Sequence, residues 1–355
     1  MKIAITADVH LTSMERNPER YHALENILQQ LVDLEIDHLI IAGDLFDSSC
    51  RDPAEFEGLF QTDQYSKIKV HIIPGNHDTI LSRGVFIQKN IKYISEPLII
   101  PFTKEAEFLL LPYEESKTVG EVLEERNFDL KLKNWVLVAH GVKIASSRQR
   151  NEYEKGMYMP LSGGDIKLYQ PKKVFLGHTH SPMDSEIVHY PGSPCGLDVT
   201  ETGIRSFLTY DTTTGNVVRV PIETDVIFFQ IPLTIIPRDD EEQYIREKLL
   251  KHITDWNLDE KQLRRVKLRI KVNGYSSDRE QALRTILEFL EGSKIYLNEN
   301  EEPDLSELKL SDDTVRADIV TTVQDRILGL EIIEGPDEPT RDDYILSAMS
   351  QIYRG

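Results

Sequence analysis

The chain has 355 residues, of which 40% are hydrophobic and 28% charged, a composition typical of a globular protein with room for two domains. Its formal net charge of −19 disfavours a protein that coats nucleic acid irrespective of sequence, because such proteins present a basic surface. No apolar run approaches the ~20 residues that span a bilayer, and two cysteines are too few for a disulfide framework. We therefore expect a cytoplasmic protein with no membrane contact.

Five short apolar stretches in the first half predict buried strands, because they are rich in β-branched residues and almost continuously apolar. They are residues 3–6, 38–42, 70–73, 135–139 and 173–176. Between the first two, residues 20–35 carry leucine and isoleucine at helical spacing, which predicts a strand–helix–strand unit. Residues 187–222 alternate apolar and polar positions between turn signals, which predicts antiparallel strands there.

The pattern changes near residues 225–232, where a second α+β unit begins. Strands are expected at 226–231, 265–272 and 294–297, and helices at 239–254 and 277–290. Residues 242–294 hold twelve Lys and Arg against nine Asp and Glu, whereas residues 295–355 hold five against fifteen. We predict three parts: residues 1–225, a small domain at 226–300, and an acidic tail at 301–355 with helices at 313–328 and 342–353.

Each predicted strand of the first half is followed by residues that commonly bind metals. Loops at the carboxyl ends of strands are where α/β sheets usually place their sites, so these loops can converge although they are far apart in sequence. The candidates are Asp8, His10, Asp44, Asp47, Asn76, His77, Asp78, His140, His178 and His180.

Seven of these side chains suit direct contact with metal ions: Asp8, His10, Asp44, Asn76, His140, His178 and His180. Seven ligands are too many for one ion, whereas two ions that share an aspartate would use them all. Carboxylate, imidazole and amide ligands without thiolate suit manganese, iron or zinc. Two such ions about 4 Å apart can bind the attacking and leaving oxygens of a phosphoryl group.

An isolated histidine is more often a packed or surface residue than a ligand, and a single Asp-x-His pair indicates little more. The run Gly75-Asn76-His77-Asp78 is more specific, since four defined residues in a row arise by chance on the order of once per thousand chains of this length. All five motifs follow a predicted strand, and this regularity disfavours the alternative that these residues have only a structural role.

The series DVH, GDLFD, GNHD, HG and GHTH resembles the calcineurin-like metallophosphoesterase superfamily over about the first 220 residues. The GDLFD form and the Pro-Gly-Ser-Pro segment at 191–194 are similar to the SbcD branch of double-strand-break repair nucleases. Protein phosphatases of the superfamily carry arginine after GDxxD and end the third motif in glutamate, where this chain has Ser48 and Asp78. The resemblance implies an α/β fold: a two-sheet αββα sandwich, a smaller α+β capping domain and a short helical C-terminal tail.

The resemblance also implies a role for each residue. The first ion would bind Asp8, His10, Asp44 and His180, and the second would bind Asp44, Asn76, His140 and His178. His77 would act as general acid and protonate the departing 3′ oxygen, or alternatively bind phosphate as a plain cation. Asp47 and Asp78 would orient the imidazole ligands, and a hydroxide bridging the two ions would attack the phosphodiester.

The activity implied is that of a manganese-dependent DNA nuclease, an exonuclease on duplex ends and an endonuclease on single strands. It would act in DNA repair and recombination as a homodimer with an SbcC-like SMC-type ATPase. The tail helix at 342–353 is a candidate docking face for that partner, and packing onto its own domain is an equal alternative.

Basic residues near the motifs are candidates for substrate contact. They are Arg83, Lys143, Arg148 and Arg150, with Ser193 of the Pro-Gly-Ser-Pro segment as a polar candidate. In the small domain, alternation places Arg265, Lys267 and Arg269 on one face of a strand. A solvated loop and an exposed sheet face are the respective alternatives.

Two other functions stay open. One is a phosphodiesterase of the same superfamily that acts on a small molecule such as a cyclic nucleotide, which the acidic net charge favours. The other is a non-catalytic interaction scaffold, which the complete set of ligands disfavours.

Overall fold

The structure is a computed structural model, and it describes residues 1–49, 53–78, 85–128, 134–144, 158–311, 313–330 and 341–354. Contacts between Cα atoms divide the chain into two compact units. Unit 1 comprises Met1–Leu197 and Ile204–Val226, and unit 2 comprises Asp198–Gly203 and Ile227–Gly355. Within the described ranges, no helix combines the length and the apolar character that crossing a membrane requires.

Unit 1 contains two six-stranded mixed sheets. Sheet 1 has the order β14-β13-β1-β2-β3-β4, with β1 Lys2–Thr6, β2 His38–Ala42, β3 Lys69–Ile73, β4 Ile91–Tyr93, β13 Ser206–Asp211 and β14 Val217–Pro221. Sheet 2 has the order β11-β12-β10-β7-β6-β5, with β5 Leu98–Pro101, β6 Glu107–Leu111, β7 Trp135–His140, β10 Lys173–Gly177, β11 Met183–Asp184 and β12 Val188–Tyr190. A two-stranded ribbon joins β8 Lys143–Ile144 to β9 Leu161–Ser162.

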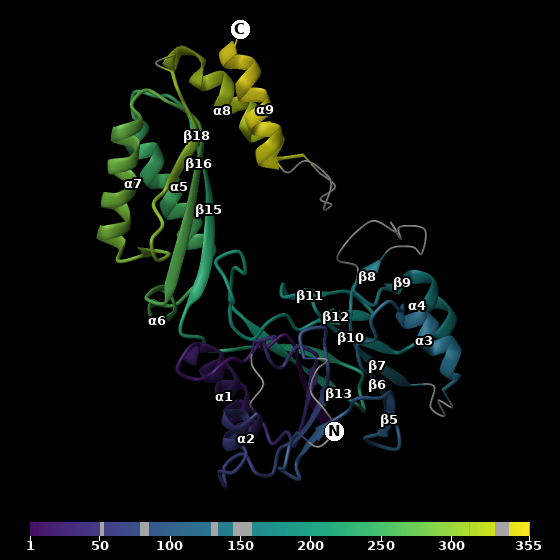
Figure 1. Cartoon of the computed structure of the whole chain (residues 1–355). Helices are drawn as coiled ribbons and strands as arrows, with labels where there is room; N and C mark the ends of the chain where they lie inside the picture. The colour runs from purple at the N-terminus through teal and green to yellow at the C-terminus, as the bar shows by residue number, and fades with distance from the viewer. Residues whose placement is uncertain are drawn as a thin grey trace. The chain divides into compact units, whose positions relative to one another are not determined.

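Helices cover the outer faces of the two sheets, which gives the αββα layers of the predicted sandwich (Figure 1). The helices are α1 Pro18–Asp33, α2 Ala54–Leu59, α3 Val119–Arg126 and α4 Gly163–Tyr169. α1 begins with proline at its first turn and buries one face, including Leu24, Leu28 and Leu31, against sheet 1. A separate core of fully buried residues from both sheets, such as Ile5 of β1 and Phe175 of β10, fills the space between them.

The five predicted strands are confirmed to within one residue at each end. β1, β2 and β3 are parallel, as are β6, β7 and β10, so their carboxyl ends lie at one edge of each sheet. The antiparallel prediction for residues 187–222 holds for the β13–β14 hairpin but is wrong in part for β12. β12 pairs parallel with β10 as well as antiparallel with β11, because the short strand β11 turns the chain back first.

Unit 2 is built on a four-stranded sheet, with β15 Ile227–Ile235, β16 Val266–Ser276, β17 Tyr296–Leu297 and β18 Asp304–Leu310. Its helices are α5 Glu241–Asp255, α6 Glu260–Leu263, α7 Arg279–Ser293, α8 Ala317–Leu328 and α9 Arg341–Arg354, with a 3-10 turn at Thr314–Arg316. α5 and α7 lie on one face of this sheet (Figure 1), where Leu249 and Ile286 pack against Leu268 and Val272 of β16. The predicted strand–helix–strand–helix–strand order of residues 226–297 is therefore confirmed.

The strand β18 was not predicted: it lies in the acidic tail expected at 301–355, before the first of the two helices predicted there. Its buried residues Leu305 and Leu308 are three positions apart, a spacing that does not read as a regular strand. The pairing with β16 shifts register between Lys271 and Asn273, where two residues of β18, Leu305 and Ser306, face one of β16. This bulge brings both leucines to the core face, so a real strand carries a non-alternating sequence.

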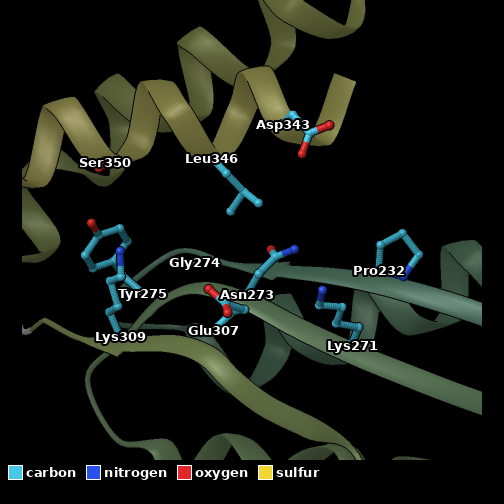
Figure 2. A pocket seen from close by; sticks show the side chains of 10 residues that line it. All are labelled: Pro232, Lys271, Asn273, Gly274, Tyr275, Glu307, Lys309, Asp343, Leu346 and Ser350. Carbon is cyan, nitrogen blue, oxygen red and sulfur yellow. The ribbon is translucent and has the colours of Figure 1, made fainter. Parts of the chain in front are cut away.

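The C-terminal helices form a small core with β16, where Tyr275 stacks near Tyr353 at 4.5 Å between ring centroids. Beside this core, a groove of about 340 Å³ separates α9 from the sheet. Figure 2 shows Leu346 of α9 and Asn273 of β16 pointing toward one another across it. The prediction that this tail also binds a partner is not tested by these contacts.

The basic strand of unit 2 alternates as expected, with Lys267 and Arg269 on the partly exposed face of β16. Part of this charge is paired within the unit. Arg269 forms a two-pronged ion pair with Glu301, at 2.8 Å and 2.5 Å, and the Lys267 ammonium lies 5.9 Å from the centre of the Tyr296 ring.

Gly274 generates a prediction about the stability of unit 2. Its φ is +96°, and a Cβ atom there would lie 2.3 Å from the carbonyl oxygen of Ile235 on the paired strand. We expect Gly274→Ala to lower the free energy of unfolding of unit 2 by about 1–3 kcal/mol. Urea unfolding would be followed by the fluorescence of Trp256 in a Trp135→Phe background, since the chain has two tryptophans.

The matched control is Gly292→Ala in α7, where a new Cβ meets no atom within 4 Å. We expect it to change the free energy by less than about 1 kcal/mol. Equal effects of the two substitutions would contradict the argument from backbone strain.

Candidate metal centre

All seven predicted ligands lie at the carboxyl-terminal edges of the two sheets of unit 1. Those from sheet 1 follow β1, β2 and β3, and those from sheet 2 end β7 or follow β10. The sheet 1 ligands are Asp8, His10, Asp44 and Asn76, and the sheet 2 ligands are His140, His178 and His180. The site is therefore a junction between two sheets, and the packing of the inter-sheet core determines how closely the two halves approach.

One group of ligands consists of Asp8, His10 and His180, whose candidate ligand atoms all lie within 4.8 Å of one another. The Nε2 atoms of His10 and His180 are 3.2 Å apart. Asp8 accepts hydrogen bonds from the backbone N–H of His178 at 2.8 Å and 3.1 Å, which ties the loop after β1 to the loop after β10.

A second group centres on the amide of Asn76. Its Oδ1 atom lies 3.0 Å from Nε2 of His140 and 3.1 Å from Nδ1 of His178. The other ring nitrogen of His140, Nδ1, donates a hydrogen bond to the carbonyl oxygen of Ala42 at 3.0 Å. This bond leaves Nε2 available to a metal ion and fixes the orientation of the ring.

Asp44 lies between the two groups. Its Oδ2 atom is 3.3 Å from Nε2 of His140 and 3.7 Å from Nε2 of His10. Its Oδ1 atom accepts a hydrogen bond from the backbone N–H of His77 at 2.8 Å. A carboxylate in this position can reach an ion in either group, so the arrangement is consistent with a site for two metal ions.

The protonation states also suit cation binding. Burial opposes ionisation of Asp44, but the hydrogen bond and charge of His140 outweigh it and lower the pKa of that carboxyl to about 2. Burial lowers the pKa of His10 and of His178 to about 4, so both rings stay neutral and keep a lone pair. His140 differs: despite burial, Asp44 raises its pKa to about 9, so a cation at this place displaces a proton from the ring.

Four of the seven ligands have left-handed backbone conformations. The φ angles of Asp8, His10, Asp44 and His178 are +53°, +49°, +50° and +88°. Such conformations are uncommon outside glycine and cost free energy, so surrounding contacts must hold them. The presence of four such conformations at one site indicates that the loops place these side chains at the expense of a low-energy backbone.

Gly43 shows how closely the two sheets approach. It has φ +93°, and a Cβ atom there would lie 2.0 Å from Nδ1 of His140. Only glycine leaves room for the His140 ring next to the loop that presents Asp44.

His77 lies beside the ligands and is exposed to solvent. Its ring centroid is 4.9 Å from that of His10, and one of its nitrogens lies within 4.8 Å of candidate ligand atoms of His10 and Asp44. An exposed imidazole next to the centre can meet a bound substrate, as the predicted general acid must.

The predicted supporting aspartates act differently from expectation. Asp78 is buried, and its two oxygens accept hydrogen bonds from the backbone N–H groups of Gly75 at 2.6 Å and Leu45 at 2.8 Å. Asp47 accepts from the N–H and hydroxyl of Ser49. Among the described residues, neither carboxylate bonds to an imidazole, so Asp78 supports the ligands by fixing their loops.

The structure describes two of the five residues that were predicted to contact substrate, Lys143 and Ser193. Arg83, Arg148 and Arg150 lie outside the described residues. Lys143 is exposed on β8, and its backbone N–H donates to the Tyr190 hydroxyl at 2.7 Å. Ser193 is fully buried, which removes it from contact with a substrate and corrects that prediction.

Arg205 is a residue that the sequence did not single out. It is 2% exposed and donates to both the carbonyl oxygen and the hydroxyl of Ser193, at 2.9 Å and 2.8 Å, and to the carbonyl oxygen of His180. Ser193 in turn donates its N–H to the same His180 oxygen at 3.1 Å. Arg20 makes a similar contact to the carbonyl oxygen of His10. The two arginines therefore hold the main chain of two histidines that face each other.

Two tyrosines complete the surroundings of the second group. The ring of Tyr158 lies 4.5 Å from that of His178, and the ring of Tyr113 lies 6.3 Å from that of His140. Neither belongs to a motif, and no sequence signal distinguishes them from other tyrosines.

Asp44 gives a direct test of the two-ion arrangement. We expect Asp44→Ala to abolish binding of both ions, because this carboxylate contacts both groups of ligands. Metal content after equilibration with manganese would be measured by elemental analysis, with Asp184→Ala as control. Asp184 pairs with His189 and Arg219 away from the centre. Two ions retained by Asp44→Ala would refute the shared position.

Arg205 gives a second test. We expect Arg205→Lys to lower the binding affinity for one of the two ions about 10-fold to 100-fold, a loss typical of residues that position a ligand. The affinity for the other ion should stay largely unchanged. Stepwise affinities would be measured by titration against a fluorescent chelator. Arg219→Lys is the control, since Arg219 donates to the carbonyl oxygens of Tyr190 and Pro191 but not to His180. Equal losses in both variants would contradict a role specific to His180.

The sequence and fold match known proteins. The family pattern described as calcineurin-like phosphoesterase matches residues 1–210. Three solved structures are similar at low identity. The hypothetical protein PH1004 from Pyrococcus horikoshii OT3 is 13% identical, with 73% of this chain and 95% of that one covered at a TM-score of 0.36. A dimetal phosphatase from Danio rerio is 12% identical, with 62% and 96% covered at a TM-score of 0.39.

The third is the cold-active protein-tyrosine phosphatase of a psychrophilic Shewanella species, 13% identical, with 63% and 80% covered at a TM-score of 0.31. These likenesses are too distant to transfer a substrate. The family match spans more than half of the chain and includes the segments that carry all seven clustered side chains. The chain belongs to the calcineurin-like phosphoesterase family.

Proposed function

We propose that this phosphoesterase is a manganese-dependent DNA nuclease that hydrolyses phosphodiesters, as an exonuclease on duplex ends and an endonuclease on single strands. The observation that carries the proposal is the shared position of Asp44 between two groups of ligands, with the exposed His77 beside them. Two bound divalent ions would supply an activated water and neutralise charge on the phosphate.

The chain's own residues perform the remaining tasks. The backbone N–H of His77 holds Oδ1 of Asp44, so the same turn that fixes the shared carboxylate presents the His77 ring to solvent. The ring can then donate a proton to a leaving oxygen, which stabilises the negative charge as the P–O bond breaks. Asp78 keeps this turn against the neighbouring loop through Gly75 and Leu45.

The choice of DNA rests on the likeness of the motifs to the SbcD branch. Ser48 replaces the arginine that follows the second motif in the superfamily's protein phosphatases, and Asp78 replaces their glutamate. A second unit of α+β type is also present, as the branch would have. A homodimer, an SbcC-like ATPase that contacts the tail, and a role in DNA repair complete the proposal.

An activity assay separates DNA from a small diester. Purified protein with manganese would be given labelled single-stranded and duplex DNA and, in parallel, bis(p-nitrophenyl) phosphate. We expect all three to be hydrolysed. Turnover of the small diester without DNA cleavage, with and without the ATPase partner, would exclude the nuclease and favour a small-molecule phosphodiesterase.

His77 tests the proton-transfer step. We expect His77→Ser to lower kcat on DNA about 10²-fold to 10⁴-fold while two manganese ions stay bound. The control is His22→Ser, because His22 is also exposed but pairs with Asp225 away from the centre. If His77→Ser lost an ion instead, His77 would be a ligand rather than a proton donor.

A further inference from the structure

Four lysines gather at the amino-terminal ends of β3 and β4, the end of sheet 1 opposite to the metal centre. Lys67, Lys69, Lys89 and Lys92 line a shallow depression of about 620 Å³, which we call the lysine hollow. All four are exposed, and within the described ranges none of them forms an ion pair. In a chain of net charge −19, this makes a local surface of opposite sign to the whole molecule.

The lysine hollow is built on ordered backbone. The amide of Asn90 donates to the carbonyl oxygens of Ser66 and Ile68, at 3.3 Å and 3.0 Å, and so ties the segment of Lys89 to that of Lys67. The N–H of Lys69 donates to the carbonyl oxygen of Asp37 at 2.8 Å. The lysines therefore project from fixed positions rather than from a free loop.

His71 lines the hollow with an unsatisfied nitrogen. It is 9% exposed, and its Nε2 atom is 3.1 Å from Nδ1 of His38. Its own Nδ1 atom is buried without a hydrogen-bond partner in the described part of the chain. When His38 donates to Nε2, the proton of His71 is on Nδ1 and lacks an acceptor in the described part of the chain.

The nearby charges point the same way. Burial is the main cause that lowers the pKa of His71 to about 4, and the charges of Lys92 and Lys69 contribute to the same lowering. Asp37 is the one carboxylate among the residues that line the hollow. An anionic ligand would relieve the repulsion among the lysines.

The lining also indicates the kind of anion. Sites for small molecules are mostly enclosed, whereas this hollow is open to solvent. Several separate ammonium groups across an open surface suit a chain of regularly spaced phosphates. We propose that the lysine hollow binds the sugar–phosphate backbone of a nucleic-acid segment remote from the phosphodiester that is cut. This inference rests on the proposed nuclease function.

Strand length sets the minimum size of such a substrate. β2 and β3 each have five residues and separate the hollow from the metal ligands by roughly 17 Å, from a rise of about 3.3 Å per residue. One strand of B-form DNA has a phosphate about every 3.4 Å along the axis, so about five nucleotides are needed to reach both places. Shorter substrates cannot contact the metal centre and the hollow at the same time.

The test compares two charge-matched variants of the full-length chain, both carrying His77→Ser to slow cleavage. One has Lys67, Lys69, Lys89 and Lys92 changed to glutamine. The other has four exposed lysines elsewhere in unit 1, Lys2, Lys104, Lys167 and Lys172, changed to glutamine. Binding of a fluorescent 30-nucleotide strand would be measured by anisotropy over a series of salt concentrations.

We expect the hollow variant to lose affinity at least about tenfold. The slope of log K against log salt should become less steep by about 3, from four lysines at ~0.7 each on single-stranded DNA. The control variant should change little, and a trinucleotide should bind both variants equally. Equal losses in the two variants, or an unchanged slope, would overturn the inference.

Two further outcomes separate this inference from the proposed function. Hydrolysis of bis(p-nitrophenyl) phosphate, measured with His77 intact, should be the same in both lysine variants. If the wild type cuts the small diester but not DNA, the nuclease proposal fails, while the slope still decides whether the hollow binds nucleic acid. If millimolar inorganic phosphate displaced the strand from the protein with the four hollow lysines but not from the hollow variant, the hollow would be a small-anion site. That result would overturn the assignment to a nucleic-acid backbone.

Discussion

The contact between Asp44 and His140 joins the two halves of unit 1, and the arrangement of the metal centre depends on it. Asp44 follows β2 of sheet 1, His140 ends β7 of sheet 2, and their side chains meet at 3.3 Å in a fully buried place. The approach is set by the inter-sheet core and by Gly43, which leaves space for the His140 ring. Because interiors are close-packed, a change in that core would shift one set of ligands against the other.

The amino-acid sequence is sufficient to predict the strands, their parallel order and the residues that cluster at their ends, because each motif directly follows an apolar run. It does not predict how those residues are held. The left-handed backbone of Asp8, His10, Asp44 and His178 cannot be read from residue type alone, although Asp and His adopt it more often than most residues. The sequence does not single out Arg205, because it lies directly before β13 and outside the metal-binding motifs, and two of the three contacts described for it are to main-chain oxygens.

Charge illustrates the same limit. The basic run on β16 is conspicuous in the sequence, yet Arg269 is paired with Glu301 and Lys267 lies over Tyr296. The lysines of the hollow are spread over residues 67–92 among apolar and acidic positions, and only the parallel pairing of β2, β3 and β4 brings them together. A run of neighbouring basic residues in the sequence thus suggested a more positive surface on β16 than the fold leaves, whereas the lysine hollow had no such run to indicate it. Residues that are close in space, rather than in sequence, determine whether a charge is paired.

The segment Asp198–Gly203 belongs to unit 2 although unit 1 continues on both sides of it. Gly203 donates its N–H to Phe228 at 2.9 Å, and Gln230 donates to the carbonyl oxygen of Val199 at 3.1 Å. The chain thus passes between the units three times rather than once. A shortened protein ending at residue 226 would keep this segment without its partners. A single cut at residue 226 therefore cannot separate the two units without leaving part of unit 2 on the unit 1 fragment.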